Sequence, residues 1–192
     1  MKEAYVRFMS NVTPASTGML LAHVSELAAS ETNRLHLLIS CIGGSLQHAL
    51  SAYNFLRGTQ IEVYTYNFGS VQSAGILPFC AGTRRFTTPT ASFMAHCAVG
   101  KIEGNASAVR NVLRWLEGED RAIARAISEA TGKPEAEVME GMRGELRLCP
   151  LEAKEYGLVH EIVTELLPKG VPVFPIDEPG PLPEGPQRIW PH

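Results

Sequence analysis

Two serines lie three positions apart in a glycine-framed segment, N-F-G-S-V-Q-S-A-G, at residues 67–75. A β-rich run precedes this segment, and an apolar helix is expected to begin at Ser73. A strand-to-helix turn can expose a serine oxygen while helix amides face the reacting atom, so Ser73 is a candidate nucleophile. Serine is also a common helix N-cap, and the turn alone leaves that interpretation open. Ser70 precedes the expected helix, and we expect it to shape the turn.

A glycine pair and a histidine are the other candidate catalytic groups. Gly43 and Gly44 follow the apolar run R-L-H-L-L-I-S at 34–40, after Cys41 and Ile42, and at such a strand end backbone can approach a ligand closely. They are either a simple strand-end turn or amide donors to an oxyanion. His96 follows another short apolar run, S-F-M-A. It could be a hydrogen-bonded core residue, or a general base that meets Ser73 across neighbouring strands.

The segments around these residues alternate between strand and helix, which predicts an α/β fold with parallel strands and right-handed crossovers. Strands are expected at 34–40, 61–67, 84–88 and 91–97, and helices at 13–30 and 45–58.

A long helix is predicted at about residues 105–131, with Asn105 as its N-cap. Its apolar positions form one stripe, and a helix of this length projects beyond a small domain or packs on a partner. Residues 168–192 hold eight of the 13 prolines, at positions 168, 172, 175, 179, 181, 183, 186 and 191. We therefore expect one domain over 1–167 and an extended, proline-rich tail over 168–192.

Composition excludes several classes of function. The net charge of −3 gives no basic surface for nucleic acid. The sequence contains no long apolar run that would span a membrane, and no secretory signal. The four cysteines are scattered and form no closely spaced metal-ligand set, so we expect no metal, no cofactor and reduced thiols in the cytoplasm.

Four motifs, in order, resemble the Clp protease proteolytic subunit (ClpP) family within the ClpP/crotonase superfamily. They are Gly43-Gly44, G-S-V-Q-S-A-G at 69–75, A-G-T-R-R-F-T-T-P-T-A-S-F-M-A-H-C-A-V-G at 81–100 and L-E-A-K-E-Y-G-L-V-H-E-I-V at 151–163. The resemblance runs from about Tyr5 to Leu167. It implies a β-β-α spiral fold with a projecting handle helix, and the activity of a serine peptidase that hydrolyses peptides or unfolded polypeptides.

The resemblance also assigns roles to individual residues. Ser73 matches the family nucleophile and His96 its general base. Gly44 and Ala74 match the positions whose backbone N–H groups form the oxyanion hole. Glu145, in R-G-E-L-R-L, falls where the family usually has the aspartate of the triad. A glutamate can orient a histidine, as other Ser-His-Glu sites do, although its extra methylene must be accommodated.

In the family, an extended peptide adds as a strand beside the segment that follows the histidine, here 98–104. This implies that Gly43, Val99, Gly100 and Lys101 bind substrate, mainly through main-chain hydrogen bonds. The family also assembles through its handle helix, so we expect a homo-oligomer, with a heptameric ring that could stack as a double ring.

Departures from the family keep other functions open. The pore-lining segment that engages an AAA+ unfoldase has no counterpart before Tyr5, so we do not expect such a partner. Together with Pro78 in the helix after Ser73, and with Glu145, this motivates an alternative, a catalytically weak or inactive ClpP-like scaffold or regulatory subunit. A more remote alternative is a crotonase-type acyl-CoA enzyme, which also holds an oxyanion with paired amides but needs no Ser-His pair.

Overall fold

The structure is a computed structural model that describes residues 2–177. The elements in chain order are β1 (Lys2–Met9), α1 (Pro14–Ala28), β2 (Thr32–Cys41), α2 (Leu46–Gly58), β3 (Glu62–Gln72), the 3₁₀ turn η1 (Ser73–Gly75), α3 (Ile76–Cys80), β4 (Arg84–Thr87), β5 (Ser92–Ala95), α4 (Ala106–Thr131), α5 (Glu135–Arg143), β6 (Leu146–Leu148), α6 (Pro150–Glu155), β7 (Glu161–Ile162) and β8 (Val173–Ile176). The alternation of strands and helices expected from the sequence is present.

Within the described residues the strands form one eight-stranded sheet whose main path has the order β6-β5-β3-β2-β1-β8. The strand pairs are parallel, with the exception of the antiparallel pair β5–β6. The parallel pairs between β1, β2 and β3 are connected through α1 and α2, as crossover geometry requires. Parallel strands bring the ends of β2, β3 and β5 to one region, which is where the candidate residues lie.

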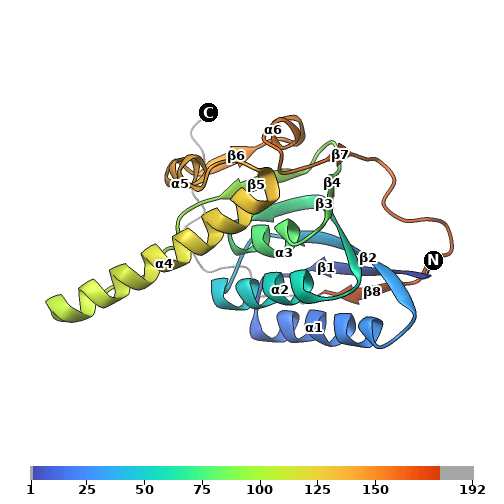
Figure 1. The fold of residues 1–192 in the computed structure, drawn as a ribbon, viewed down its shortest axis with the longest axis horizontal. Helices are drawn as coiled ribbons and strands as arrows, with labels where there is room; N and C mark the ends of the chain where they lie inside the picture. The colour runs from blue at the N-terminus through green and yellow to red at the C-terminus, as the bar shows by residue number, and fades with distance from the viewer. Residues whose placement is uncertain (1, 178–192) are drawn as a thin grey trace.

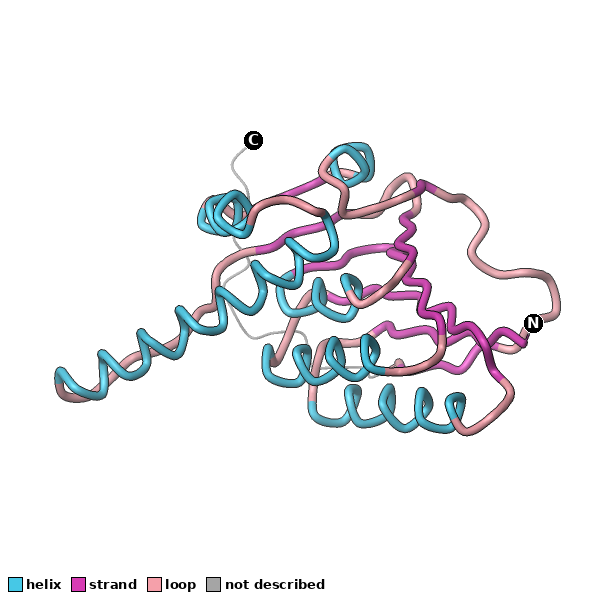
Figure 2. Tube along the Cα trace, in the orientation of Figure 1, coloured by secondary structure: helices cyan, strands magenta, loops and turns pink. Residues whose placement is uncertain are grey.

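Helices α1, α2 and α3 lie side by side over one face of the sheet (Figures 1 and 2). The Thr13 hydroxyl accepts a hydrogen bond from Ser16 N–H, and the Ser16 hydroxyl accepts one from Thr13 N–H, so α1 begins with a capping box. Leu20 and Val24 on α1 and Leu37 on β2 are buried in the same main core. Within residues 2–177, no helix is both long enough and apolar enough to cross a membrane.

Strand β3 changes its partner halfway along its length, and this change positions the candidate site. Residues 64–67 pair with β4, whereas residues 70–72 pair with β5. The sequence-based prediction of a turn at Ser70 is therefore wrong, because Ser70 continues the strand and its hydroxyl lies 3.2 Å from the Ser92 hydroxyl on β5. The chain leaves the sheet only at Ser73.

The sheet does not end where the sequence predicts that the domain ends. Residues 173–176, which fall in the expected proline-rich tail, form β8 and pair in parallel with β1. Pro175 is tolerated there because β8 is an edge strand, where a missing N–H leaves no partner unsatisfied. Arg7 on β1 also donates from Nε to Asp177 over 3.2 Å. The rest of the predicted tail, 178–192, lies outside the described residues.

Helix α4 matches the expected long helix and projects from the body of the molecule (Figure 1). Asn105 caps it by accepting hydrogen bonds from the N–H groups of Ser107 and Ala108. The buried residues of α4 lie between positions 119 and 127, so the C-terminal half packs on the body and the N-terminal half extends away. The buried Arg85 guanidinium ties the end of α4 to the sheet by donating to Ala130 O.

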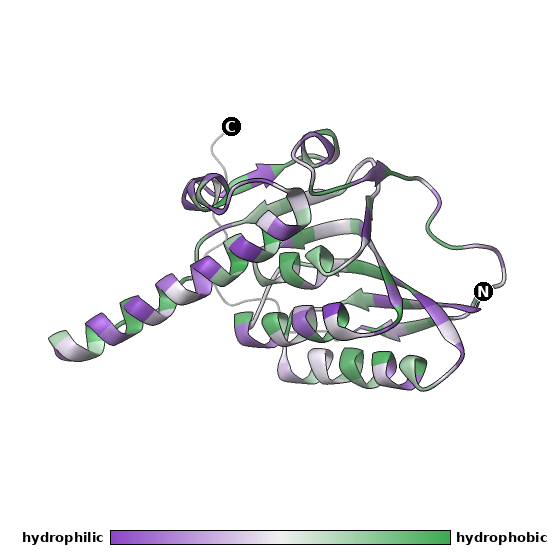
Figure 3. Ribbon diagram, in the orientation of Figure 1, coloured by the Kyte–Doolittle hydropathy of each residue, from purple (hydrophilic) through white to green (hydrophobic). Residues whose placement is uncertain are grey.

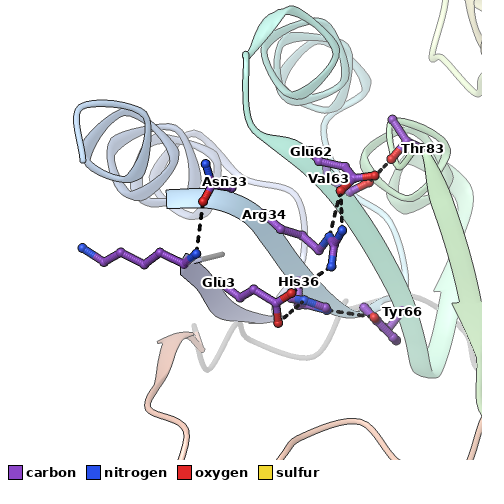
Figure 4. Close-up of polar contacts among 9 residues, drawn as sticks. Glu3, Asn33, Arg34, His36, Glu62, Val63, Tyr66 and Thr83 are labelled. Atoms are coloured by element: carbon purple, nitrogen blue, oxygen red, sulfur yellow. Dashed lines mark hydrogen bonds and ion pairs between the residues drawn. The ribbon is translucent and has the colours of Figure 1, made fainter. Parts of the chain in front are cut away.

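The sheet face opposite α1–α3 carries an aromatic and charged cluster (Figure 4). His36 is stacked against the Tyr5 ring at a centroid distance of 4.3 Å, and its Nδ1 lies 2.8 Å from the Tyr66 hydroxyl. Arg34 forms ion pairs with Glu3 at 2.8 Å and with Glu62 at 2.7 Å. This cluster joins β1, β2 and β3 through their side chains, in addition to their backbone hydrogen bonds.

Candidate active site

Ser73 occupies the first position after β3 and has a left-handed backbone with φ of 51°. A non-glycine residue in this region is strained and persists where its surroundings fix it, a condition that is common at catalytic turns. The turn leads through η1 directly into α3, so the Ser73 side chain lies at the junction of a strand end and a helix start. Pro78 lies within the short α3. Because proline has no backbone N–H, it cannot donate a helical hydrogen bond at this position.

The structure brings Ser73 and His96 into direct contact. His96 Nε2 lies 2.8 Å from Ser73 Oγ, which is hydrogen-bond distance for proton transfer. The contact follows from the sheet, because the ends of β3 and β5 are paired through Gln72 and Met94 and both residues emerge just beyond that pair. The sequence leaves two interpretations open for His96. The structure agrees with the second, in which His96 contacts Ser73 across neighbouring strands.

The glycine pair lies beside the serine with a backbone that other residues would strain. Gly43 and Gly44 have φ values of +128° and +134°. A Cβ at Gly43 would lie 2.9 Å from Ser73 Cβ, and one at Gly44 would lie 2.3 Å from Val12 O. Side chains are therefore excluded at both positions, and the backbone itself faces the serine.

The residues predicted to form an oxyanion hole, Gly44 and Ala74, lie where a backbone N–H can be left without a regular secondary-structure acceptor. Val12 N–H donates to Gly43 O, and Ser45 N–H donates to Val12 O, so Val12 bridges the residues on both sides of Gly44. In such a parallel bridge the N–H of the middle residue, Gly44, is directed away from the bridging strand. Ala74 lies in the first turn of η1, where N–H groups have no intrahelical acceptor. Both residues line the same cleft as Ser73.

The structure does not bring the Glu145 carboxylate to His96. Glu145 accepts a hydrogen bond from Arg147 Nη2 at 2.9 Å, and within residues 2–177 its carboxylate makes no hydrogen bond with His96. The backbone nevertheless aligns the two residues, because β5 and β6 pair Ala95 with Leu146 and the next pair in this antiparallel register would be His96 with Glu145. Glu145 itself is exposed and has φ of 56°.

Ser73 and His96 open into a cleft of about 380 Å³. The cleft is lined by Gly44, Ser45, Leu46, Gln47, Ser73, Ala74, His96, Ala98, Val99, Trp115, Glu119 and Ile123. Of the residues expected to bind substrate, Val99 lines this cleft, whereas Gly43, Gly100 and Lys101 do not. The volume falls in the range of sites that hold small ligands or side chains.

The segment after His96 is anchored to α4. Ala98 N–H donates to Asp120 Oδ1 at 2.6 Å, and a Cβ at Gly100 would lie 3.3 Å from the Leu116 side chain. Val99 between them is 85% exposed. This segment is therefore held close to the helix and leaves its outer edge open, as the addition of a peptide strand would require.

Comparison with known proteins shows the family to which this chain belongs. The sequence profile described as Clp protease matches residues 1–166. The chain belongs to the Clp protease family. The resemblance that the sequence motifs indicate is thereby confirmed.

Two curated relatives are proteolytic subunits. The chain is 25% identical to the ATP-dependent Clp protease proteolytic subunit 3, chloroplastic, of Arabidopsis thaliana, over 99% of this chain and 61% of that protein. It is 27% identical to the ATP-dependent Clp protease proteolytic subunit 3 of Rhizobium meliloti (strain 1021), over 86% of each. This chain thus spans less than two thirds of the chloroplast relative.

A solved structure shows the same fold. A point mutant of ClpP1 from Listeria monocytogenes superposes with a TM-score of 0.78, over 84% of this chain and 91% of that chain, at 21% identity. The predicted ClpP-like α/β fold is therefore confirmed. Membership in the family supports a function of the serine-protease type.

Sequence reasoning missed the α4 side of the cleft. Trp115, Glu119 and Ile123 recur every four residues on α4 and line the cleft together. The same spacing is typical of any amphipathic helix. Of these three residues, only Ile123 belongs to the apolar stripe expected from the sequence, which consists of Val109, Val112, Leu113, Leu116, Ile123, Ile127 and Ala130. Only the packing of α4 beside the strand ends shows that the three residues face the serine.

Proposed function

We propose that this protein is a serine peptidase of the Clp protease family that hydrolyses peptides or unfolded polypeptides without needing ATP for the chemical step. The observation that carries the proposal is the 2.8 Å contact between His96 Nε2 and Ser73 Oγ, at a strained strand-to-helix turn. The two curated relatives are named as proteolytic subunits, which agrees with this chemistry.

In the proposed mechanism His96 accepts the Ser73 proton while Ser73 Oγ attacks the scissile carbonyl carbon. The carbonyl oxygen becomes an oxyanion, which accepts hydrogen bonds from Gly44 N–H and Ala74 N–H. His96 then donates its proton to the leaving amine, and a water molecule hydrolyses the acyl-enzyme by the same steps in reverse. Removing one oxyanion donor typically slows such reactions about 10²- to 10³-fold.

We propose that substrate lies beside the segment 98–101 as an added strand, with Gly43, Val99, Gly100 and Lys101 contacting its main chain. We also propose that Glu145 completes the triad after its carboxylate leaves Arg147. The projecting α4 supports assembly into a homo-oligomer, and a heptameric ring is the arrangement that we propose.

The test is covalent labelling with a fluorophosphonate, which reacts with an activated serine hydroxyl. The wild type is expected to gain one adduct, located at Ser73 by mass spectrometry of the digested protein. Ser73→Ala should abolish the adduct, and His96→Ala should slow its formation strongly because the base is lost. Ser70→Ala is the matched control, since it removes a hydroxyl from the same segment and should leave labelling intact.

A second candidate function, an inactive scaffold, is favoured by the Glu145–Arg147 ion pair. It predicts a folded, assembled protein that forms no adduct at Ser73 with the fluorophosphonate or with any activated peptide ester. That outcome would overturn the peptidase proposal.

A further inference from the structure

Glu119 places an acidic group in the wall of the catalytic cleft. It lies on α4, one turn from Trp115 and one turn from Ile123, and lines the cleft together with Ser73 and His96. The residue is only 9% exposed. Among the described residues its carboxylate forms no hydrogen bond or ion pair. Its side chain is therefore largely buried, and no described residue supplies the counter-charge that normally accompanies an acid in such a position.

The surroundings of Glu119 also disfavour the charged form of its carboxyl group. Burial raises the pKa of the Glu119 carboxyl, and the neighbouring Asp120 raises that pKa further. Asp120 is itself an acid, and its carboxylate accepts a hydrogen bond from Ala98 N–H. A cation that enters the cleft would therefore find an unpaired acid in a partly desolvated place, where charge-assisted hydrogen bonds are strong.

The rest of the lining fits the stem of a basic side chain. Leu46, Trp115 and Ile123 contribute apolar surface to the same cleft. Lysine and arginine side chains cover apolar surface with their methylene groups and present the charge at the end. The cleft, with its apolar wall and the acidic Glu119, therefore matches a side chain that has an apolar stem and a positively charged end.

We propose that Glu119 makes this site select substrates with a lysine or arginine side chain next to the scissile bond. The inference rests on the proposed peptidase function. Ser73 and the two oxyanion residues line this cleft, so the residue whose carbonyl carbon is attacked lies against it. Its side chain extends toward α4, where the ammonium or guanidinium group donates hydrogen bonds to the Glu119 carboxylate.

The test uses two activated peptide esters that differ only at the residue before the ester, lysine in one and norleucine in the other. The two side chains share the same four-carbon stem, so their kcat/KM ratio isolates the terminal charge. The wild type should prefer lysine, and Glu119→Gln should reduce that preference by roughly 10- to 100-fold through loss of the lysine reaction. Glu119→Asp keeps the charge and should restore part of the preference.

Glu117→Gln is the matched control, because Glu117 is an exposed acid on the same helix outside this cleft. It should leave the lysine preference unchanged. Thermal unfolding and fluorophosphonate labelling of each variant show that it is folded and that Ser73 reacts. If labelling is normal and the wild type shows no lysine preference, or Glu119→Gln keeps it, the inference is overturned while the peptidase proposal stands. Failure of Ser73 to label in the wild type overturns both.

Discussion

At the scale of single residues, the serine and histidine are placed for reaction while the acid is not. Ser73 Oγ and His96 Nε2 already lie at a hydrogen-bond distance of 2.8 Å. Glu145 lies one register step beyond the last β5–β6 pair, opposite His96, but its carboxylate is bound by Arg147 on β6. In the proposed triad, the side chain of Arg147 would therefore compete with His96 for the Glu145 carboxylate. Rotation of Glu145 between these partners would control how well His96 is oriented.

This competition predicts opposite effects for two substitutions. Glu145→Gln should slow the fluorophosphonate reaction of Ser73 by about 10²- to 10⁴-fold, because an amide does not stabilise the imidazolium. Arg147→Met should instead raise the rate, since the Glu145 carboxylate loses its ion-pair partner. The rates are measured by intact-mass time courses.

A double-mutant cycle sharpens this prediction. In the Glu145→Gln background, Arg147→Met should have no further effect, because the competing carboxylate is already absent. Arg143→Met is a control that removes an exposed arginine paired with Glu140 on α5. A normal labelling rate for Glu145→Gln would show that Glu145 does not orient His96.

At the scale of elements, the strand pattern is predictable from the sequence and the changes of strand partner are not. Parallel strands and the long helix follow from periodicity, but the same reasoning places Ser70 in a turn because Gly69 precedes it. The structure continues β3 through both residues, since Asn67 ends the pairing with β4 and Ser70 begins the pairing with β5. The prolines around 173–176 likewise predict a tail, and only the free edge of β1 explains why these residues pair.

In the candidate site, local sequence motifs identify some residues, whereas only long-range packing identifies others. Motifs identify Ser73, His96 and Gly44, because each chemistry-bearing residue lies at a strand end within a short, specific segment. Glu119 carries no such signal, since it is one acid among many on a charged helix. Its importance arises from burial against the strand ends, far along the chain from Ser73, and no local pattern contains that contact.

His36, in the side-chain cluster across β1, β2 and β3, is expected to make the stability of the protein depend on pH. Burial lowers the pKa of His36, and the raising effect of Glu3 does not offset it. The folded protein therefore resists protonating His36, whereas the unfolded chain protonates it below about pH 6.5. Its contribution to stability is present above that pH and is lost as the pH falls.

His36→Phe should accordingly reduce the loss of unfolding free energy between about pH 8 and about pH 5.5, measured by urea denaturation. The variant keeps an aromatic ring beside Tyr5 but leaves the Tyr66 hydroxyl without its partner, so it should be less stable at the higher pH. Val63→Ala, which truncates a buried side chain of β3, is the control. It should lower stability by a similar amount at both pH values. An unchanged pH dependence in His36→Phe would assign the effect to other groups.

At the scale of the whole molecule, α4 presents apolar side chains that the described chain does not cover. Val109 and Leu113 lie one turn apart on its projecting half and are 38% and 50% exposed. Figure 3 shows hydrophobic residues along this part of α4, interleaved with hydrophilic ones. Exposed apolar surface on a projecting helix is unfavourable in water and is typical of a surface that is buried in an assembly. The proposed homo-oligomer would cover it with a second copy of the same helix.

This assembly predicts a mass in solution that is a multiple of the 20.9 kDa chain. Light scattering coupled to size-exclusion chromatography measures it directly, and a seven-fold multiple or its double is the expected value for rings. Leu113→Glu should shift the population toward smaller species, because a charge would be buried in the contact between copies. Arg110→Gln changes an exposed polar residue on the same half of α4 and should leave the mass unchanged. A monomeric wild type would contradict the assembly, and the exposed half of α4 would then have to bind a different partner.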